Sequence, residues 1–507
     1  MRYMQWSGSS DATNAGSTVL PEDIWELTAS EAATLIRSRR VTSLQLMKAW
    51  LSRIEAFAQL NAFITVNHEA SLLKAQAYDE YLAKGGSDLA LGGVPIAIKD
   101  NIQVVGFANT AGTPGLDGFH PQVDAVVVRQ LLAAGAIIVG KTNMDELAFG
   151  ASGYNTAYHC WDVVGIRNPF ASSRIAGGSS GGSASAVGAR LVPLALGTDT
   201  GGSVRQPCAL TGCVGFRPTV GRYSRKGIVP VSFTRDTPGP MARAVEDISL
   251  IDCVLTLQPP LPLPEANTLR LGVLKEFWDG IDEPVATTAN SALNKLKDAG
   301  IGLVEVSFPQ VHSLNAQISM PIAMFEARGA LTEYLAENGA NLTLEELVSK
   351  ISSPAVRSIF SEHILPPAPD LQGSIEDDLQ EAYKAAMHDG RPRLIELFRK
   401  LFENHDLDAI IFPTTPELAL ESGPQSAEFA TFSRMIRNVD PTSNASMPGI
   451  SLPIGLDDHS GLPVGMEVDA LPGDDQQLLA IAAVLEKILG RGVSPIRLRA
   501  TAAASLP

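Results

Sequence analysis

Two glycine-rich segments of the chain hold serines in positions where a hydroxyl could react. The first, AGGSSGGSASA, contains Ser179, and the second, GTDTGGSVR, contains Ser203. Two glycines before Ser203 allow the backbone to bend so that consecutive N–H groups point to one spot, as in an oxyanion hole. A serine hydroxyl is a weak nucleophile until a base removes its proton. The spacing therefore indicates nucleophilic catalysis in the second segment, with a base supplied from elsewhere.

Lys99 is a natural candidate for that base. It ends the apolar segment VPIAIKD, which is typical of a buried strand. Burial disfavours the ammonium form, so the pKa of a buried lysine falls from about 10.4 toward neutral pH, where the free amine accepts a proton. A salt bridge between Lys99 and Asp100 or another carboxylate is the structural alternative. None of the eight histidines lies in a Gly-x-Ser-x-Gly segment, although the fold could bring one to a serine.

Both serine segments also have simpler interpretations. GGSSGGS could be a flexible linker, but ASAVGARLVPLALGTD, which follows it at once, predicts a small-residue helix and a strand. GTDTGGSVR could be a tight turn in which Ser203 caps the next helix. From these residues alone, catalysis by serine and lysine and the structural alternatives both stay open.

Two further motifs match catalytic patterns. GAIIVGKT at 135–142 fits a P-loop, but its variable residues are Ala, Ile, Ile and Val, which are typical of the strand itself rather than of a phosphate-binding loop. A P-loop nucleotide binder is therefore kept only as a remote alternative. SLLK at 71–74 fits the S-x-x-K pattern, but its neighbours predict an exposed amphipathic helix, and neither S-D-N nor K-T-G accompanies it.

The elements that must position these residues alternate between strand and helix. VPIAIKD and AIIVGK predict strands on either side of the helical segment DAVVVRQLLAAG. Near the end, LDAIIFPTTP, GISLPIGL and PVGMEVDAL predict three more strands, and DDQQLLAIAAVLEKILG predicts a closing helix. The Pro-rich stretch at 257–267 is expected to be a linker or surface crossing. Strand signals at both ends favour an α/β fold with one sheet assembled from distant segments.

Composition narrows the classes of function. The chain has 507 residues and a formal net charge of −16, which argues against nucleic-acid or anionic-membrane partners. Four cysteines without a C-x-x-C pair predict neither a disulfide framework nor a zinc site. The N-terminus lacks an apolar signal region, and no apolar stretch reaches the roughly 18 residues of a membrane span, so a cytoplasmic protein is expected.

A series of segments in fixed order resembles the amidase signature family. The segments are GGVPIAIKDNI, GKTNMDELAFG, AGGSSGGSASAV, LALGTDTGGSVRQPCALTGCVGFRPTVGRYS, TPGPMAR, LDAIIFPTTP and MPGISLPIGL with GLPVGMEV. The resemblance covers about residues 25–490. It implies a layered α/β/α fold with a large mixed central sheet flanked by helices. The expected organisation is a disordered leader at 1–24, a helical segment at 25–60, and one amidase domain at 61–500. The signature core of this domain is expected at about 90–255 and a helical elaboration at about 315–405.

The resemblance also implies roles for individual residues. Lys99, Ser179 and Ser203 match the family's Ser–cisSer–Lys triad, in which Ser203 is acylated and Ser179 relays its proton to Lys99. The oxyanion hole is expected from the main-chain N–H groups of Thr200, Gly201, Gly202 and Ser203. Asp199 and Arg205 match a supporting polar pair beside that loop. Neither a metal nor an organic cofactor is implied.

The implied activity is hydrolysis of a carboxamide C–N bond to a carboxylate and ammonia. Small primary aryl or 2-hydroxy-aryl amides such as mandelamide are the expected substrates. A glutamine amidotransferase subunit of a multi-chain complex is the main alternative, and a homodimer stays open as the assembly state. Met320, Phe325, Phe432 and Met435 are candidates for the substrate pocket, with core packing as the alternative for each.

Overall fold

The computed structural model describes residues 24–160, 162–365 and 372–495, so most of the predicted leader at 1–24 lies outside the described residues. Within these ranges the strands are β1 (Phe63–Val66), β2 (Pro95–Lys99), β3 (Ile137–Thr142), β4 (Leu194–Asp199), β5 (Val214–Arg217), β6 (Thr237–Ala242), β7 (Arg270–Leu274), β8 (Gly302–Val306), β9 (Ala409–Pro413), β10 (Gly449–Leu456) and β11 (Pro463–Asp469).

The α-helices connect these strands along the chain, and some extend beyond the sheet. They are α1 (Ala29–Arg37), α2 (Ser43–Ala56), α3 (His68–Ala83), α4 (Val126–Ala133), α5 (Gly181–Gly188), α6 (Arg205–Thr211), α7 (Val245–Thr256), α8 (Glu283–Asp298), α9 (Val311–Glu337), α10 (Leu344–Ser349), α11 (Pro354–Ile359), α12 (Gln372–Ala385), α13 (Arg391–His405), α14 (Phe429–Met435), α15 (Asp440–Asn444) and α16 (Asp475–Leu489).

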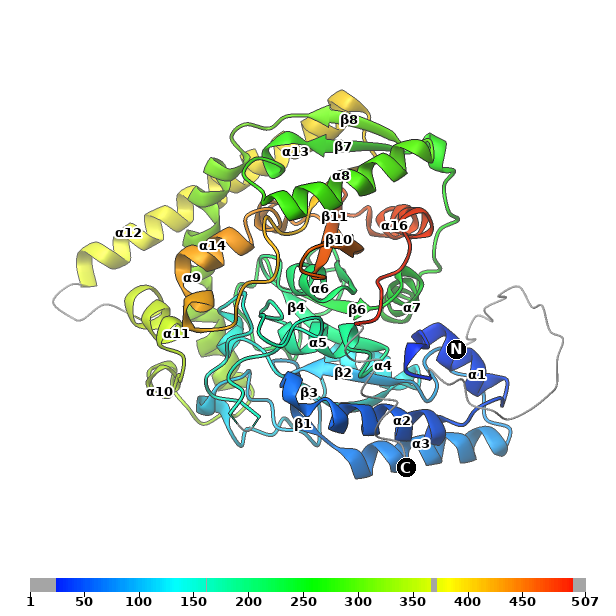
Figure 1. Ribbon diagram of the computed structural model, residues 1–507. Helices are drawn as coiled ribbons and strands as arrows, with labels where there is room; N and C mark the ends of the chain where they lie inside the picture. The colour runs from blue at the N-terminus through cyan, green and yellow to red at the C-terminus, as the bar shows by residue number, and fades with distance from the viewer. Residues whose placement is uncertain (1–23, 161, 366–371, 496–507) are drawn as a thin grey trace.

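One mixed sheet holds all the described strands, in the order β1-β3-β2-β4-β6-β5-β10-β11-β9-β7-β8. It runs from β1 at the bottom of Figure 1 to β8 at the top. Strand β2 pairs in parallel with β3 and β4, whereas β4, β6, β5, β10, β11 and β9 pair antiparallel in succession. Distant segments therefore share one sheet, and the predicted α/β class with a large mixed sheet is confirmed.

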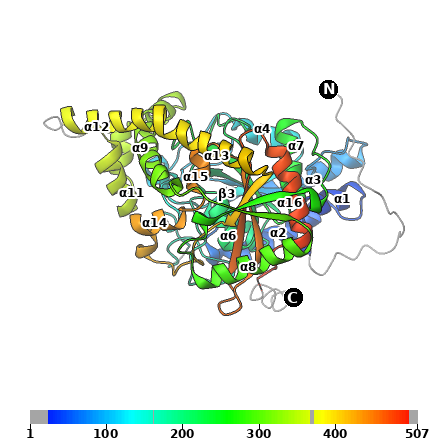
Figure 2. The ribbon, with the colours of Figure 1, turned by 90° about the horizontal axis from the view of Figure 1, so that it is seen from above.

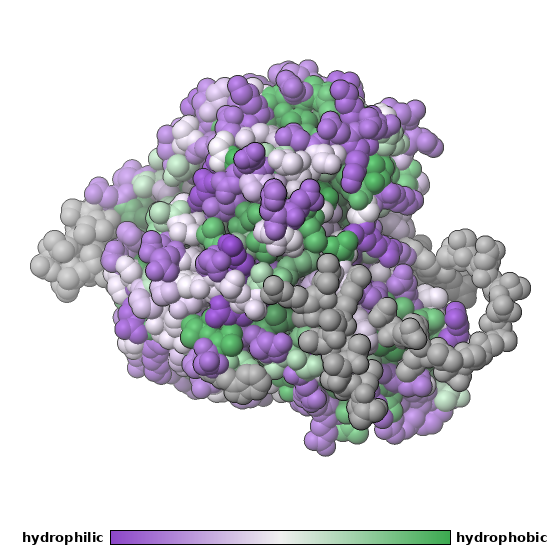
Figure 3. Space-filling view, viewed as in Figure 1, coloured by the Kyte–Doolittle hydropathy of each residue, from purple (hydrophilic) through white to green (hydrophobic). Residues whose placement is uncertain are grey.

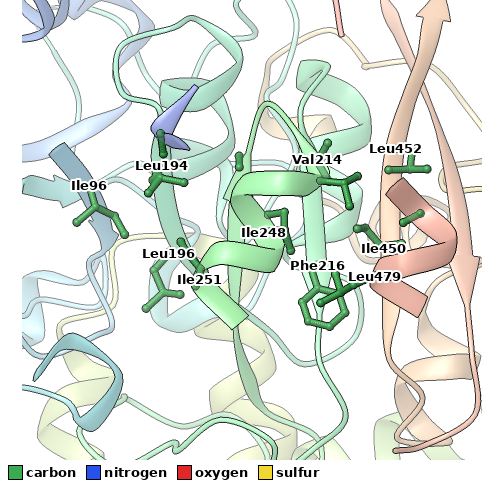
Figure 4. Packing of buried hydrophobic residues seen from close by; sticks show 14 of the residues in the cluster. Ile96, Leu194, Leu196, Val214, Phe216, Ile248, Ile251, Ile450, Leu452 and Leu479 are labelled. Atoms are coloured by element: carbon green, nitrogen blue, oxygen red, sulfur yellow. The ribbon is translucent and has the colours of Figure 1, made fainter. Parts of the chain in front are cut away.

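Buried side chains alternate between the two faces of the sheet. Ile96 of β2 and Leu194 of β4 pack toward Ile248 of α7 on one face, and Figure 4 shows them in this cluster. Ala97 lies in the cluster on the opposite face, together with Ala184 of α5. This two-residue period follows from the pleat of a strand and gives the layered arrangement.

A group of helices extends the molecule to one side of the sheet. Figures 1 and 2 both show α9, α11, α12 and α14 gathered on the side away from α1. Helices α9 to α13 fall within or close to the predicted helical elaboration at 315–405, and α1 and α2 lie in the predicted helical segment at 25–60. Thr28 and Glu31 form a capping box at the start of α1.

Strands β7 and β8 are among those that were not predicted from the sequence. Strands β7 and β8 pair in parallel beyond the Pro-rich stretch. Each has five residues, and the segment GLVEV of β8 is largely half-buried. Short segments of this kind give a weak periodic signal, so only the pairing with β9 identifies them as part of the sheet.

The outer surface is mixed in polarity. In Figure 3, hydrophilic residues are spread over the face in view and separate smaller hydrophobic patches. Among the described residues, no helix has the length and apolar character needed to cross a membrane.

Candidate active site

Lys99 lies at the C-terminal end of β2 and is fully buried. Because side chains alternate along a strand, Lys99 shares the face of Ala97, which is the face covered by α5. Its Nζ lies 2.7 Å from Oγ of Ser179 and 2.8 Å from Oγ1 of Thr198. The neighbouring Asp100 pairs instead with Lys141, at 3.1 Å, so the alternative of a Lys99–Asp100 salt bridge is wrong.

Lys141, the partner of Asp100, is the lysine of the motif on which the P-loop alternative depends. Residues 137–142 of GAIIVGKT form strand β3, and the Lys141 side chain within it is fully buried. A strand in the middle of a sheet does not direct its N–H groups around a phosphate. The structure therefore contradicts the P-loop interpretation.

Ser179 is held directly before α5 by contacts of its backbone. The Gly178–Ser179 peptide bond is cis. The N–H of Gly178 donates to Oε1 of Gln206 at 2.9 Å, and the carbonyl of Ser179 accepts from the N–H of Asp145 at 3.2 Å. These contacts place the buried Ser179 hydroxyl beside the lysine amine.

Ser203 lies in the turn between β4 and α6 and is partly exposed to a cavity. Its carbonyl accepts from the N–H of Ser180 at 3.2 Å, so a backbone hydrogen bond joins the two serine segments. The N-cap of α6 is Val204, so the alternative in which Ser203 caps that helix is wrong.

In the turn that is predicted to form the oxyanion hole, one of the four N–H groups is already bonded within the chain. Thr200, Gly201 and Ser203 line the cavity. Gly202 instead directs its N–H to Oδ1 of Asp199, at 2.8 Å. Its φ is +120°, and a Cβ at this position would lie 2.2 Å from Cγ2 of Val439, so only glycine fits here. A hole at this turn would therefore use the other three residues.

Asp199 and its ion-pair partner Arg205 stabilise this turn. The Asp199 carboxylate accepts from the N–H groups of Gly202 and Val204 and forms ion pairs with Arg205 at 3.1 Å and Arg217 at 2.8 Å. Burial alone would raise the pKa of Asp199, but the two guanidinium groups hold it far below its usual value. The carboxylate thus stays ionised and keeps its hydrogen bonds to the loop.

Burial dominates the charge state of Lys99. Removal from water lowers the pKa of Lys99 to about 7, although Asp145 and Asp199 oppose this shift by attraction. Burial likewise raises the pKa of Asp145 to about 6, against the hydrogen bond from the Gly153 N–H and the nearby lysine. Near neutral pH a sizeable fraction of Lys99 is therefore the free amine, which is the form that can act as a base.

A cavity of about 1020 Å³ opens onto Ser203. Much of its wall is apolar, and Met320 and Phe432 are part of it, as is Ile436. The two other candidates from the sequence lie elsewhere: Met435 is buried in a separate cluster, and Phe325 stacks on Tyr383 with ring centres 4.1 Å apart. Two of the four candidates therefore belong to the cavity wall.

Several polar residues around the lysine were missed by sequence reasoning. Thr198 contacts Lys99 directly and accepts from Nδ2 of Asn101 at 3.1 Å, and Asp145 faces both Lys99 and the cavity. Thr198 stands next to Asp199 in LALGTDTGGS, and polar residues at the C-terminal end of a buried strand were the available signal.

Comparison with known proteins identifies the family of the chain. A family model described as Amidase matches residues 45–479. The chain is 58% identical to mandelamide hydrolase of Pseudomonas putida over 94% of each protein. It is 39% identical to indoleacetamide hydrolase of Agrobacterium vitis, over 91% of this chain and 97% of that protein.

A solved structure extends the agreement to three dimensions. The peptide amidase of Stenotrophomonas maltophilia superimposes with a TM-score of 0.75 at 28% identity, over 94% of this chain and 99% of that one. The resemblance noted in the sequence is confirmed, since both the family model and the relatives extend over most of the chain. The chain belongs to the amidase family and is an amide-hydrolysing enzyme.

Proposed function

We propose that the enzyme hydrolyses small primary aryl amides, and 2-hydroxy-aryl amides such as mandelamide in particular, through an acyl-enzyme on Ser203. The observation that carries the proposal is the contact of 2.7 Å between the Lys99 amine and the Ser179 hydroxyl, beside a turn that presents Ser203 to an apolar cavity.

In the proposed first half-reaction, the Ser203 oxygen attacks the amide carbon. Ser179 accepts the proton of Ser203 and passes its own proton to the free amine of Lys99. The N–H groups of Thr200, Gly201 and Ser203 stabilise the negative oxygen of the tetrahedral intermediate. The proton returns by the same path to the leaving nitrogen, the C–N bond breaks, and ammonia departs.

In the second half-reaction, water attacks the acyl group on Ser203. Lys99, again a free amine, accepts one proton of that water through Ser179, and this proton returns to the Ser203 oxygen as its bond to the acyl group breaks. The product leaves as the carboxylic acid, which loses its remaining proton to water near neutral pH. The proton transfers in this scheme use only side chains of the enzyme, so activity should withstand a chelator.

The cavity wall supports aryl substrates. Met320, Phe432 and Ile436 offer apolar surface to a ring, and the names of two relatives refer to amides that carry an aryl group. A free glutamine substrate would need separate charges for its amino and carboxylate groups. The apolar surface of Met320, Phe432 and Ile436 offers no such charge and therefore favours the aryl amide over glutamine.

An ammonia-release assay tests the proposal on mandelamide, phenylacetamide, benzamide and glutamine, with Ser203→Ala as the inactive control. The proposal predicts hydrolysis of the aryl amides by the purified chain alone. Hydrolysis of glutamine only, in the presence of a partner protein, would instead support the amidotransferase alternative. A cytoplasmic location and a homodimeric state stay predictions, to be tested by cell fractionation and size-exclusion chromatography.

A further inference from the structure

Arg235 and Asp440 form a buried ion pair in the wall of the substrate cavity. Arg235 is 2% exposed and Asp440 is 3% exposed. Nη2 of Arg235 donates to Oδ1 of Asp440, and its Nη1 donates to the carbonyl oxygen of Ser319 at 3.0 Å. Nδ2 of Asn315 donates to Oδ2 of Asp440 at 2.7 Å. The carboxylate is therefore fixed by donors from separate segments of the chain.

The pair lies against the turn that presents the reacting serine. A Cβ on Gly201 would be 2.6 Å from Oδ1 of Asp440 and 3.1 Å from Nη2 of Arg235. Gly201 precedes Ser203 by two residues and lines the same cavity, as do both members of the pair. A group on the carbon next to the scissile carbonyl would thus meet this part of the wall.

Asp440 retains capacity to accept a further hydrogen bond. A carboxylate has about four lone-pair positions. Oδ2 accepts from Asn315 and, at 3.4 Å, from Asn444. Among the described residues, the bond to Oδ1 comes from Arg235, and Oδ1 is the oxygen that faces Gly201. Oδ1 therefore offers an acceptor next to the reacting centre.

Protein stability alone does not explain why a buried ion pair lies in this place. Removing two charges from water is unfavourable, and apolar side chains of similar volume often serve a buried position equally well. Pockets for small ligands, in contrast, use a few fixed polar groups in apolar walls to orient the ligand. The apolar surroundings, which include Val231 and Ile436, match the second situation.

We propose that Asp440, held by Arg235 and Asn315, determines specificity by accepting a hydrogen bond from the 2-hydroxyl group of the amide substrate. This inference rests on the proposed function and names the feature of the substrate that the site selects. The hydroxyl is on the carbon attached to the reacting carbonyl, so the bond orients that carbonyl toward Ser203. The selection appears in kcat/KM as a preference for 2-hydroxy amides over amides of equal size without a donor.

The first test uses the unaltered enzyme and a series of phenylacetamides that differ in the substituent on carbon 2, the carbon attached to the amide carbonyl. The substituents are hydroxyl, methyl as a group of similar size, methoxy as an acceptor without a donor, and hydrogen. The 2-hydroxy amide should exceed the other three in kcat/KM by about tenfold to hundredfold. Equal values for hydroxyl and methyl would overturn the inference and leave the proposed function intact. Hydrolysis of none of the four would overturn both.

The second test uses Asp440→Asn, which keeps the shape of the side chain. The ratio of kcat/KM for the 2-hydroxy amide to that for the 2-methyl amide should fall about tenfold. This ratio is unaffected by a loss of folded enzyme. The matched control is Asp282→Asn, an exposed carboxylate paired with Arg434, for which the ratio should not change. An unchanged ratio in Asp440→Asn would contradict the assignment. If that variant does not fold, Asn315→Ala serves in its place, with a smaller fall expected.

Discussion

The proposed proton relay and the cavity wall are built in different ways. Lys99 and Thr198 come from the ends of the adjacent parallel strands β2 and β4, and Ser179 comes from the segment just before α5. The cavity wall, in contrast, combines residues of α9, α11, α14 and several loops. The residues proposed for the chemistry are thus held by the central sheet, whereas the shape of the cavity depends on helices that lie to one side of the sheet.

Packing differs between the two regions as well. Around the relay there is no room for an added methyl group at Gly182, where a Cβ would lie 2.4 Å from the carbonyl oxygen of Ala62, or at Gly197, where it would lie 2.8 Å from Oγ of Ser180. The wall uses Met320 and Phe432, whose side chains can be exchanged for others of similar volume. We therefore expect substitutions in the relay to cause large losses of activity, and substitutions in the wall to cause small losses that depend on the substrate.

The largest effect is expected for Lys99→Ala. Loss of the base should lower kcat by at least about 10³-fold, as for other residues of catalytic units that act together. Steady-state assays of ammonia release measure it, and circular dichroism checks the fold. The matched control is Lys74→Ala, which removes the exposed lysine of SLLK and should leave kcat unchanged. Near-normal turnover in Lys99→Ala would exclude the lysine from the mechanism.

A smaller loss is expected for Gly202→Ala. The added Cβ would collide with Val439 at a φ of +120°, and the resulting shift would displace the N–H groups of the turn. We expect kcat to fall about 10²-fold to 10³-fold, the range seen when one donor of an oxyanion hole is removed. Gly473→Ala is the control, since its φ is also positive, at +99°, but its Cβ would meet open space. Equal activity of the two variants would show that the turn tolerates the change.

The sequence predicts the relay far better than the wall. Lys99, Ser179 and Ser203 stand in short contiguous motifs whose chemistry and family resemblance point to them. Thr198 was missed because its importance depends on which strand lies beside β2. The Arg235–Asp440 pair joins positions 205 residues apart, and no spacing rule connects them. Gly202 shows the same limit within a motif, because the orientation of its N–H depends on the carboxylate of Asp199.

A moderate effect on the pH profile is expected for Asp145→Asn. Because the carboxylate of Asp145 stabilises the charged form of Lys99, its removal should lower the pKa of that lysine further below about 7. In the unaltered enzyme, kcat/KM should rise with pH through about 7, as the free amine forms. In Asp145→Asn this rise should move to lower pH. An unmoved rise, or one at higher pH, would contradict the coupling. Asp298→Asn, an exposed site, is the control.

The smallest effect is expected for Phe432→Leu in the wall. Loss of aromatic surface should raise the KM for mandelamide about threefold to tenfold. The KM for an aliphatic amide such as lactamide should change less. Phe325→Leu is the matched control, because Phe325 stacks on Tyr383 and is not among the described residues that line the cavity. Equal changes in KM for both amides would show that Phe432 does not recognise the ring.

Trapping the acyl-enzyme is the most direct test of the mechanism. The enzyme would be mixed with mandelamide, quenched in acid during turnover, digested and examined by peptide mass spectrometry. The account predicts one mandeloyl group on the peptide that contains Ser203, and its absence in Ser203→Ala. A mandeloyl group on any other residue, Ser179 included, would contradict the assignment of the nucleophile and of the relay that serves it.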